Sequence, residues 1–238
     1  MIRYLNVLLF TGMIVMNYLA NALPLNNKTT GQLSDQYSNL FVPAGITFSI
    51  WGVIYLLLAV YCILQFSAHM KPVAENIGWL FALSCIMNSL WIFAWHYEKL
   101  PLSLFIMIVL LVSLIQINIA ITDLKPGFIK AVFGVYLGWI CIATIANVTA
   151  LLVNYNWNGF GISQETWSVI MIIAGAIITT LTIIKLKNPY TGLAVMWAFT
   201  GIIIKQYGDH RMIVVTAIIG IVVSAIFSVT VLIQQFVK

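Results

Sequence analysis

Charge is the scarcest property of this 238-residue sequence, because Asp, Glu, Lys and Arg together make up only 7% of it. Soluble domains carry about 25% charged residues, so the composition excludes an ordinary soluble domain. Hydrophobic residues make up 62% of the chain, which indicates an integral membrane protein whose surroundings are a lipid bilayer. The net charge of +5 is therefore no sign of nucleic-acid binding, since the Lys and Arg residues lie almost entirely at the ends of apolar segments.

Charges are missing above all from the interior of the apolar segments. All six acidic residues fall in connections or at segment ends, and the cations do the same. Ion pumps and proton-coupled transporters need ionisable groups inside the membrane, where burying them is costly. This absence argues against both classes, but it leaves open a facilitator of uncharged substrates.

Cysteine and histidine are also sparse, with three of each. Cys62, Cys85 and Cys141 lie far apart in apolar stretches and match no metal or redox spacing, so we expect packing residues. The sequence has no phosphate loop, dinucleotide fingerprint or paired histidines. We therefore expect no catalytic residue, no metal and no cofactor, and we lean against an enzyme. His96 could ligate a haem iron, but a lone histidine at a membrane edge is more often a solvated helix end, which is what we expect here.

Eight apolar segments are long enough to be considered as membrane-spanning helices, which need about 20 residues. They are residues 4–22, 44–66, 76–96, 101–122, 128–153, 166–184, 190–207 and 212–236. The seventh segment is the shortest. The sequence thus predicts an all-α membrane protein with eight helices, in which only the connections 23–43 and 154–165 are long.

Cations are unevenly shared between the two ends of these helices. Seven lie on the side of the N-terminus and four on the other side, which predicts a multi-pass protein with both termini in the cytoplasm. Both long connections would then be external, and the cell membrane is the expected location. In an alternative interpretation, residues 1–22 are a cleaved signal peptide, which would leave seven helices.

Aromatic residues recur at helical spacing in three segments. Pro43 is expected in the first turn of the second helix, where Trp51 and Tyr55 share one face. In the third segment, Asn88 and Trp91 share a face that continues to a further tryptophan, Trp95. Trp95 lies near a helix end, where an interfacial role is also open.

The fifth segment carries the longest stripe, with Tyr136, Trp139, Ala143 and Asn147 on one face. Gly134 and Gly138 form a G-x-x-x-G that lets another helix approach closely. The three stripes are compatible with an aromatic-walled cavity for a flat apolar ligand, and also with ordinary helix packing. The amides of Asn88 and Asn147 are likewise compatible with hydrogen bonds between helices and with contacts to a ligand. Trp79, Trp157 and Trp167 are expected in the interfacial belt.

These three stripes resemble motifs of the tryptophan-rich sensory protein family, TspO/MBR, whose animal members are the mitochondrial translocator proteins. Pro43 to Tyr55 resembles the family's second helix, and Asn88-x-x-Trp91 its third. Tyr136-x-x-Trp139-x-x-x-Ala143-x-x-x-Asn147 matches the fifth-helix pattern at every position. The resemblance covers residues 4–153, whereas the short members of the family end there. This chain is therefore similar to a longer, divergent branch.

The resemblance implies a five-helix bundle over residues 1–153, with residues 154–238 adding a loop and three helices. It implies a pocket for a tetrapyrrole or another hydrophobic ligand beneath the 23–43 connection, which would act as a lid. The pocket residues that it implies are Trp51, Tyr55, Asn88, Trp91, Tyr136, Trp139, Ala143 and Asn147.

Three functions remain open from the sequence. A receptor or carrier for a flat hydrophobic molecule is the leading one. A facilitative transporter of a small uncharged substrate is the second, although the prolines do not break any helix at mid-membrane. Light-dependent porphyrin breakdown, which would make the protein an enzyme, is the third. The sequence also leaves open whether the chain forms a homodimer.

Overall fold

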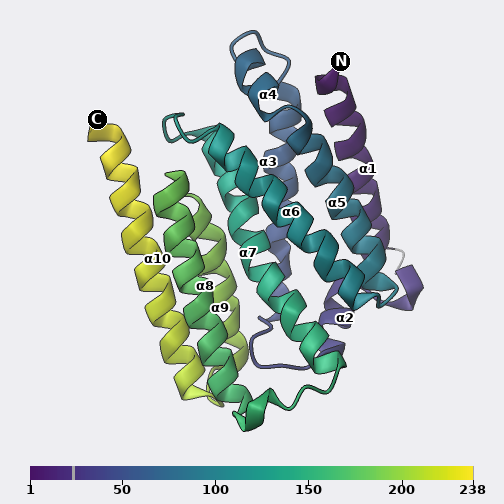
Figure 1. The fold of residues 1–238 in the computed structure, drawn as a ribbon, viewed down its shortest axis with the longest axis vertical. Coiled ribbons are helices and arrows are strands. Elements are labelled where there is room, and N and C mark those ends of the chain that lie inside the picture. Colours follow the sequence, from purple (N-terminus) through teal and green to yellow (C-terminus); the bar gives the residue numbers. More distant parts are fainter. Residues whose placement is uncertain (23–24, 238) are drawn as a thin grey trace.

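The computed structural model describes residues 1–22 and 25–237, and within that part of the chain it contains helices and no strands (Figure 1). The α-helices are α1 (Ile2–Ala22), α2 (Thr30–Gln36), α3 (Ile50–Leu64), α4 (Lys71–Ile77), α5 (Trp79–His96), α6 (Leu100–Ala120), α7 (Phe128–Asn154), α8 (Gln164–Leu186), α9 (Thr191–Gln206) and α10 (Arg211–Val237). Three short 3-10 helices accompany them, namely η1 (Leu25–Asn27), η2 (Gly45–Ser49) and η3 (Gly159–Gly161).

The expected all-α membrane fold is confirmed. Among the described residues, seven helical segments are long and apolar enough to cross a membrane, namely α1, η2 with α3, α5, α6, α7, α8 and α10. The remaining expected span, α9, has 16 residues. At 1.5 Å per residue it is about 24 Å long, shorter than the hydrocarbon core of about 30 Å.

The helices form two groups on either side of α7 (Figure 1). Helices α1, α3, α5 and α6 lie on one side, and α8, α9 and α10 lie on the other. Both described ends of the chain lie at the same end of the bundle, and α4 lies there too. The two long connections lie at the opposite end, which we call the lid end.

Two boundaries differ from the sequence-based expectation. Pro43 precedes the second span, which starts as the 3-10 turn η2 and becomes α-helical only at Ile50. The third span starts at Trp79 because Gly78, at φ 51°, ends the separate helix α4. Positive φ is readily adopted only by glycine, so this residue sets the break.

Close approach of α9 to α7 depends on the two glycines of the G-x-x-x-G motif. A Cβ atom on Gly138 would meet the backbone of Thr191, and one on Gly134 would meet the side chain of Asn188. Asn188 donates from Nδ2 to Asn118 Oδ1 (2.7 Å) and to Lys130 O (2.9 Å). The motif therefore joins the C-terminal helices to the rest of the chain. That residues 1–153 form a separate unit stays a prediction.

Lys130 is fully buried near the end of the bundle that holds the termini. Its ammonium group donates three hydrogen bonds: to Thr122 O (2.9 Å), to Lys187 O (2.8 Å) and to Gln235 Oε1 (2.7 Å). One cation thus joins the ends of α6, α8 and α10 to α7. Lys238, one of the seven cations on the side of the N-terminus, lies outside the described residues.

Candidate functional site

A cavity lies beneath α2 at the lid end, and we call it the inner cavity. Five predicted pocket residues line it: Trp51, Trp91, Trp139, Ala143 and Asn147. The other lining residues are Thr30, Ser34, Val42, Pro43, Phe48, Trp95, Ile142, Ala146 and Ala150. The α7 contributors recur every three or four residues, so the predicted stripe does form one wall.

The aromatic side chains around the inner cavity pack on one another. Trp91 and Trp95 are stacked with ring centroids 5.6 Å apart, and Trp51 and Tyr55 are stacked at 5.4 Å. Trp139 lies edge-on to Trp51, at 6.1 Å. These are favourable geometries for aromatic pairs. As a result the tryptophans of α3, α5 and α7 form one continuous apolar wall.

Several polar atoms on this wall have no hydrogen-bond partner among the described residues. They are the indole N–H groups of Trp91, Trp95 and Trp139, together with Nδ2 of Asn147, and all are buried. Asn147 uses only its Oδ1, which accepts a bond of 3.2 Å from Ser103. Buried donors are nearly always paired, and one left unpaired costs about 1–3 kcal/mol. Residues that line the cavity therefore carry buried donors that lack acceptors.

The three other predicted pocket residues do not line the inner cavity. Asn88 accepts from Asn17 Nδ2 (2.8 Å) and donates to Tyr136 Oη (2.9 Å), so it joins α1, α5 and α7. Tyr55 lines a neighbouring hollow that also contains Asn17 and Trp51. The side chains of Asn88 and Tyr136 thus bond helices to one another. Whether any of the eight contacts a ligand stays a prediction.

The inner cavity has a volume of about 50 Å³. Pockets for drug-sized ligands have volumes of about 300–1,000 Å³. In this conformation the inner cavity thus has room for little more than one or two water molecules, each of which occupies about 30 Å³ in the liquid. A flat multi-ring ligand would enter only if the aromatic side chains and the covering segment moved apart.

The covering segment, residues 25–43, contains a helix where the sequence suggested only a loop. We call it the lid segment; Leu23 and Pro24, the first residues of the expected lid, lie outside the described residues. Thr29 and Gln32 form a capping box that starts α2. Leu33 is fully buried, while Thr30 and Ser34 face the inner cavity. This helix is the roof of the cavity.

Glu98, in the turn between α5 and α6, holds the lid segment in place. Its carboxylate accepts from Lys28 Nζ (2.9 Å), Gln36 Nε2 (3.1 Å) and Tyr37 Oη (3.1 Å). These four residues form what we call the Glu98 cluster. The hydrogen bond from Lys28, with further bonds from Gln36 and Tyr37, lowers the pKa of Glu98. Burial, and then the bond to Glu98, raises the pKa of Tyr37 to about 12.

We predict that acid loosens the lid segment. Because the pKa of Glu98 is lowered when the lid is closed, the cluster favours closure above the ordinary pKa of a glutamate, about 4.3. Closure weakens as the pH falls below this ordinary value and through the lowered one, which sets the window for the test. Hydrogen–deuterium exchange of residues 30–37, corrected for the intrinsic rate, should rise severalfold across this window.

The Glu98→Gln variant should already exchange fast at pH 7 and change little with acid, because it lacks the ionised carboxylate. Glu75→Gln is the matched control, since Glu75 pairs only with Lys71, at 4.0 Å and on the outside of α4. Equal protection of α2 in the wild type and in Glu98→Gln at pH 7 would show that the cluster does not hold the lid.

His96 corrects a sequence-based expectation. It is fully buried and not solvated. Its Nδ1 lies 2.8 Å from Ile92 O, and its Nε2 lies 3.5 Å from Thr30 Oγ1 in the lid segment. Trp95 is also buried, so it belongs to the cavity wall and not to an interfacial belt. The spacing of Trp91 and Trp95, four residues apart, was the signal for this in the sequence.

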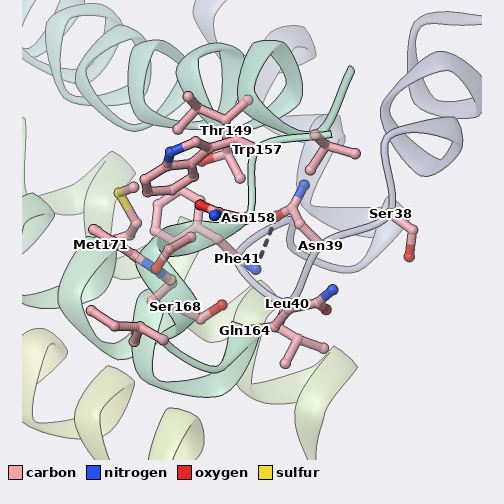
Figure 2. A pocket seen from close by; sticks show the side chains of 15 residues that line it. Ser38, Asn39, Leu40, Phe41, Thr149, Trp157, Asn158, Gln164, Ser168 and Met171 are labelled. Carbon is pink, nitrogen blue, oxygen red and sulfur yellow. Dashed lines mark hydrogen bonds between the residues drawn. The ribbon is translucent and has the colours of Figure 1, made fainter. Parts of the chain in front are cut away.

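A second hollow, the outer cavity, lies on the other side of residues 38–41 and has a volume of about 220 Å³. Figure 2 shows Phe41 and Asn39 of the lid segment facing Thr149 of α7, Trp157 of the following loop and Met171 of α8. Trp157 and Trp167 were expected in the interfacial belt, yet both line this cavity. Trp79, by contrast, is 63% exposed.

The comparisons with known proteins give one match. A family model described as "TSPO-like protein" matches residues 3–230. The match reaches beyond residue 153, where the resemblance seen in the motifs ends, and so includes α8, α9 and most of α10. No curated protein and no solved structure matches the chain.

Proposed function

Because the chain belongs to the TSPO-like protein family, we propose that it binds a flat hydrophobic small molecule, such as a tetrapyrrole, in the inner cavity. Family membership and the apolar helices make it an integral, multi-pass membrane protein. The proposal concerns sensing or carrying the ligand, with no covalent step. The cation count further leads us to propose a cell-membrane location with both termini in the cytoplasm.

The observation that carries this proposal is the set of unpaired donors on an aromatic wall. Three indole N–H groups and one amide around the same cavity lack acceptors among the described residues. A ligand with a flat ring system would cover the tryptophan faces, and its carbonyl or ring-nitrogen atoms would accept from these groups. Ala143 and Ala146, both small, leave the α7 face open to such a ring.

Binding requires the roof to open, because the inner cavity is too small as it stands. The contacts that hold the roof in place are weak enough to allow such a motion. Glu98 and Lys28 are each about a third exposed at the side chain, 33% and 38%, so their ion pair is a weak bond. The remaining closure depends on Leu33 and on aromatic contacts such as Tyr37 with Trp95, at 5.9 Å.

The test is a titration of the purified protein in detergent with protoporphyrin, haem and a sterol, followed by tryptophan quenching. We expect Trp139→Phe to weaken binding about tenfold, because it removes one donor and part of the ring face. Trp51→Phe should weaken it by a similar factor through lost stacking. Trp79→Phe, a change on the exposed surface, is the matched control and should bind as the wild type does.

No quenching above a detergent blank would refute the proposal for these ligands. Uptake of a substrate into sealed vesicles without stoichiometric binding would favour a facilitative transporter instead. Light-dependent loss of the porphyrin absorption band would favour breakdown of the ligand. A further check uses the lid: if opening limits entry, Glu98→Gln should speed association while leaving the wall intact.

A further inference from the structure

The outer cavity has a wall that is fixed before any ligand arrives. Trp167 donates from Nε1 to Gly159 O (2.8 Å), and its ring lies 4.9 Å from that of Trp157. Gly159 has φ 62°, and a Cβ atom there would crowd the Trp167 ring. A glycine is thus needed both for the turn and for the close approach of the indole.

The loop that carries this wall contains a backbone conformation that is unfavourable for its residue type. Phe160 lies at φ 53°, in the left-handed region, which an asparagine such as Asn156 (φ 50°) tolerates but a phenylalanine does not. Asn158 supports the turn by accepting from Phe160 N (3.1 Å). A left-handed conformation at such a residue costs about 1–3 kcal/mol. The loop is thus held in this shape at a cost in free energy.

The chemistry of the lining limits what the outer cavity can hold. It contains no Asp, Glu, Lys, Arg or His. A charged ligand would therefore be desolvated without a counter-charge, which is strongly unfavourable. The interior is mostly apolar, with Phe41, Trp157 and Met171 beside the hydroxyl groups of Thr149 and Ser168, whereas Asn158 and Gln164 are exposed. Their amides can donate to or accept from a polar group at the mouth.

The outer cavity is distinct from the inner one. The two share no lining residue, and residues 40–43 form the wall between them: Leu40 and Phe41 face the outer cavity, Val42 and Pro43 the inner. This wall is held from α9, where Gln206 Nε2 donates to Leu40 O (2.9 Å) and Gly201 O accepts from Ala44 N (3.0 Å). Half of the outer cavity comes from the loop after α7 and from α8.

We propose that the outer cavity is a second ligand site, for a small uncharged molecule with one aromatic ring and one hydroxyl or carbonyl group. The ring packs against Trp157 and Met171, and the polar group reaches the amides of Asn158 and Gln164. A volume of about 220 Å³ lies below the range for drug-sized ligands, which selects single-ring compounds. The site is independent of whether the inner cavity binds a tetrapyrrole.

The test uses 4-fluorobenzyl alcohol as the probe and ¹⁹F NMR as the readout, with the full-length protein in detergent micelles and empty micelles as the blank. For a ligand of this size we expect saturable binding with a Kd of about 1 mM. The charged analogues 4-fluorobenzoate and 4-fluorobenzylammonium should bind at least about tenfold more weakly. This comparison tests the uncharged lining.

Four variants locate the probe. Trp157→Ala removes the ring surface, and Ser168→Phe fills the cavity from a buried position on α8. Each should weaken binding at least about fivefold while the thermal midpoint shows that the protein is folded. Trp79→Ala, at the start of α5, and Ala143→Val, which adds two methyl groups beside the inner cavity, should leave probe binding unchanged.

Three results would overturn the proposal. One is the absence of saturable binding above empty micelles. Another is loss of binding in Ala143→Val with retention in folded Ser168→Phe, which would place the probe in the inner cavity. The third is equal binding of the charged analogues. If Trp157→Ala does not fold, Ser168→Phe alone decides, because it adds bulk and removes no contact of the loop.

Discussion

Replacing Gly138 with valine is expected to lower the free energy of unfolding by about 3 kcal/mol, the upper end of the range for overpacked sites. A Cβ atom at Gly138 would meet the backbone carbonyl of Thr191 and the side chain of Ala194. Backbone cannot rotate away as a side chain can, so α9 would have to move off α7. Gly138→Ala should show a smaller loss of the same sign.

Gly52→Val is the matched control for this prediction. Gly52 lies on α3, where a Cβ atom would have nothing within 4 Å, so the same substitution adds an exposed apolar group and no clash. Unfolding by increasing fractions of sodium dodecyl sulfate in mixed micelles, followed by circular dichroism, measures both variants. If the two free energies differ by less than about 0.5 kcal/mol, α9 is not packed on α7 as described.

Lys130→Met is expected to lower the free energy of unfolding by about 3 kcal/mol. Methionine has a similar length but cannot donate, so the three bonds of the ammonium group to Thr122, Lys187 and Gln235 are lost. Hydrogen bonds to charged groups contribute about 1.5–3 kcal/mol each. Part of this is offset, because the buried cation no longer has to be desolvated. Lys187 O also keeps its bond from Gln235 Nε2 (2.9 Å).

Lys125→Met removes the same charge from an exposed position in the connection just before α7 and is the control for Lys130→Met. It should change the free energy of unfolding by no more than about 0.5 kcal/mol. The same micelle titration applies. Equal effects of the two variants would mean that the charge, and not the three hydrogen bonds, determines the stability of this end of the bundle.

The spans of the bundle could be predicted from the sequence because each depends on local composition. Uninterrupted apolar runs with polar breaks place α1, α6 and α10 to within a few residues. The short helix α2 also has a local signal in the sequence, the Thr29-x-x-Gln32 capping box, although it lies in a polar stretch that otherwise indicates a loop. Pro43 is expected in the first turn of the second helix, but it precedes the 3-10 turn η2, and the α-helix begins only at Ile50.

The candidate site was predictable only in part, because periodicity gives the face of a helix but not what that face meets. The Trp139–Asn147 stripe does line the inner cavity, whereas Asn88 bonds to Asn17 and Tyr136. Trp157 and Trp79 are both expected in the interfacial belt from the sequence; in the structure one lines a cavity and the other is exposed. That difference depends on α8 and the lid segment, which are distant in the sequence.

The wall of residues 40–43 between the two cavities has a thermodynamic consequence. A ligand in one cavity that shifts this wall changes the free energy of binding in the other cavity. Linkage then requires reciprocity: if a molecule in the outer cavity alters the affinity of the inner one by some factor, an inner ligand alters the outer affinity by the same factor. Because α9 holds the wall through Gln206 and Gly201, the C-terminal helices would set the size of that factor.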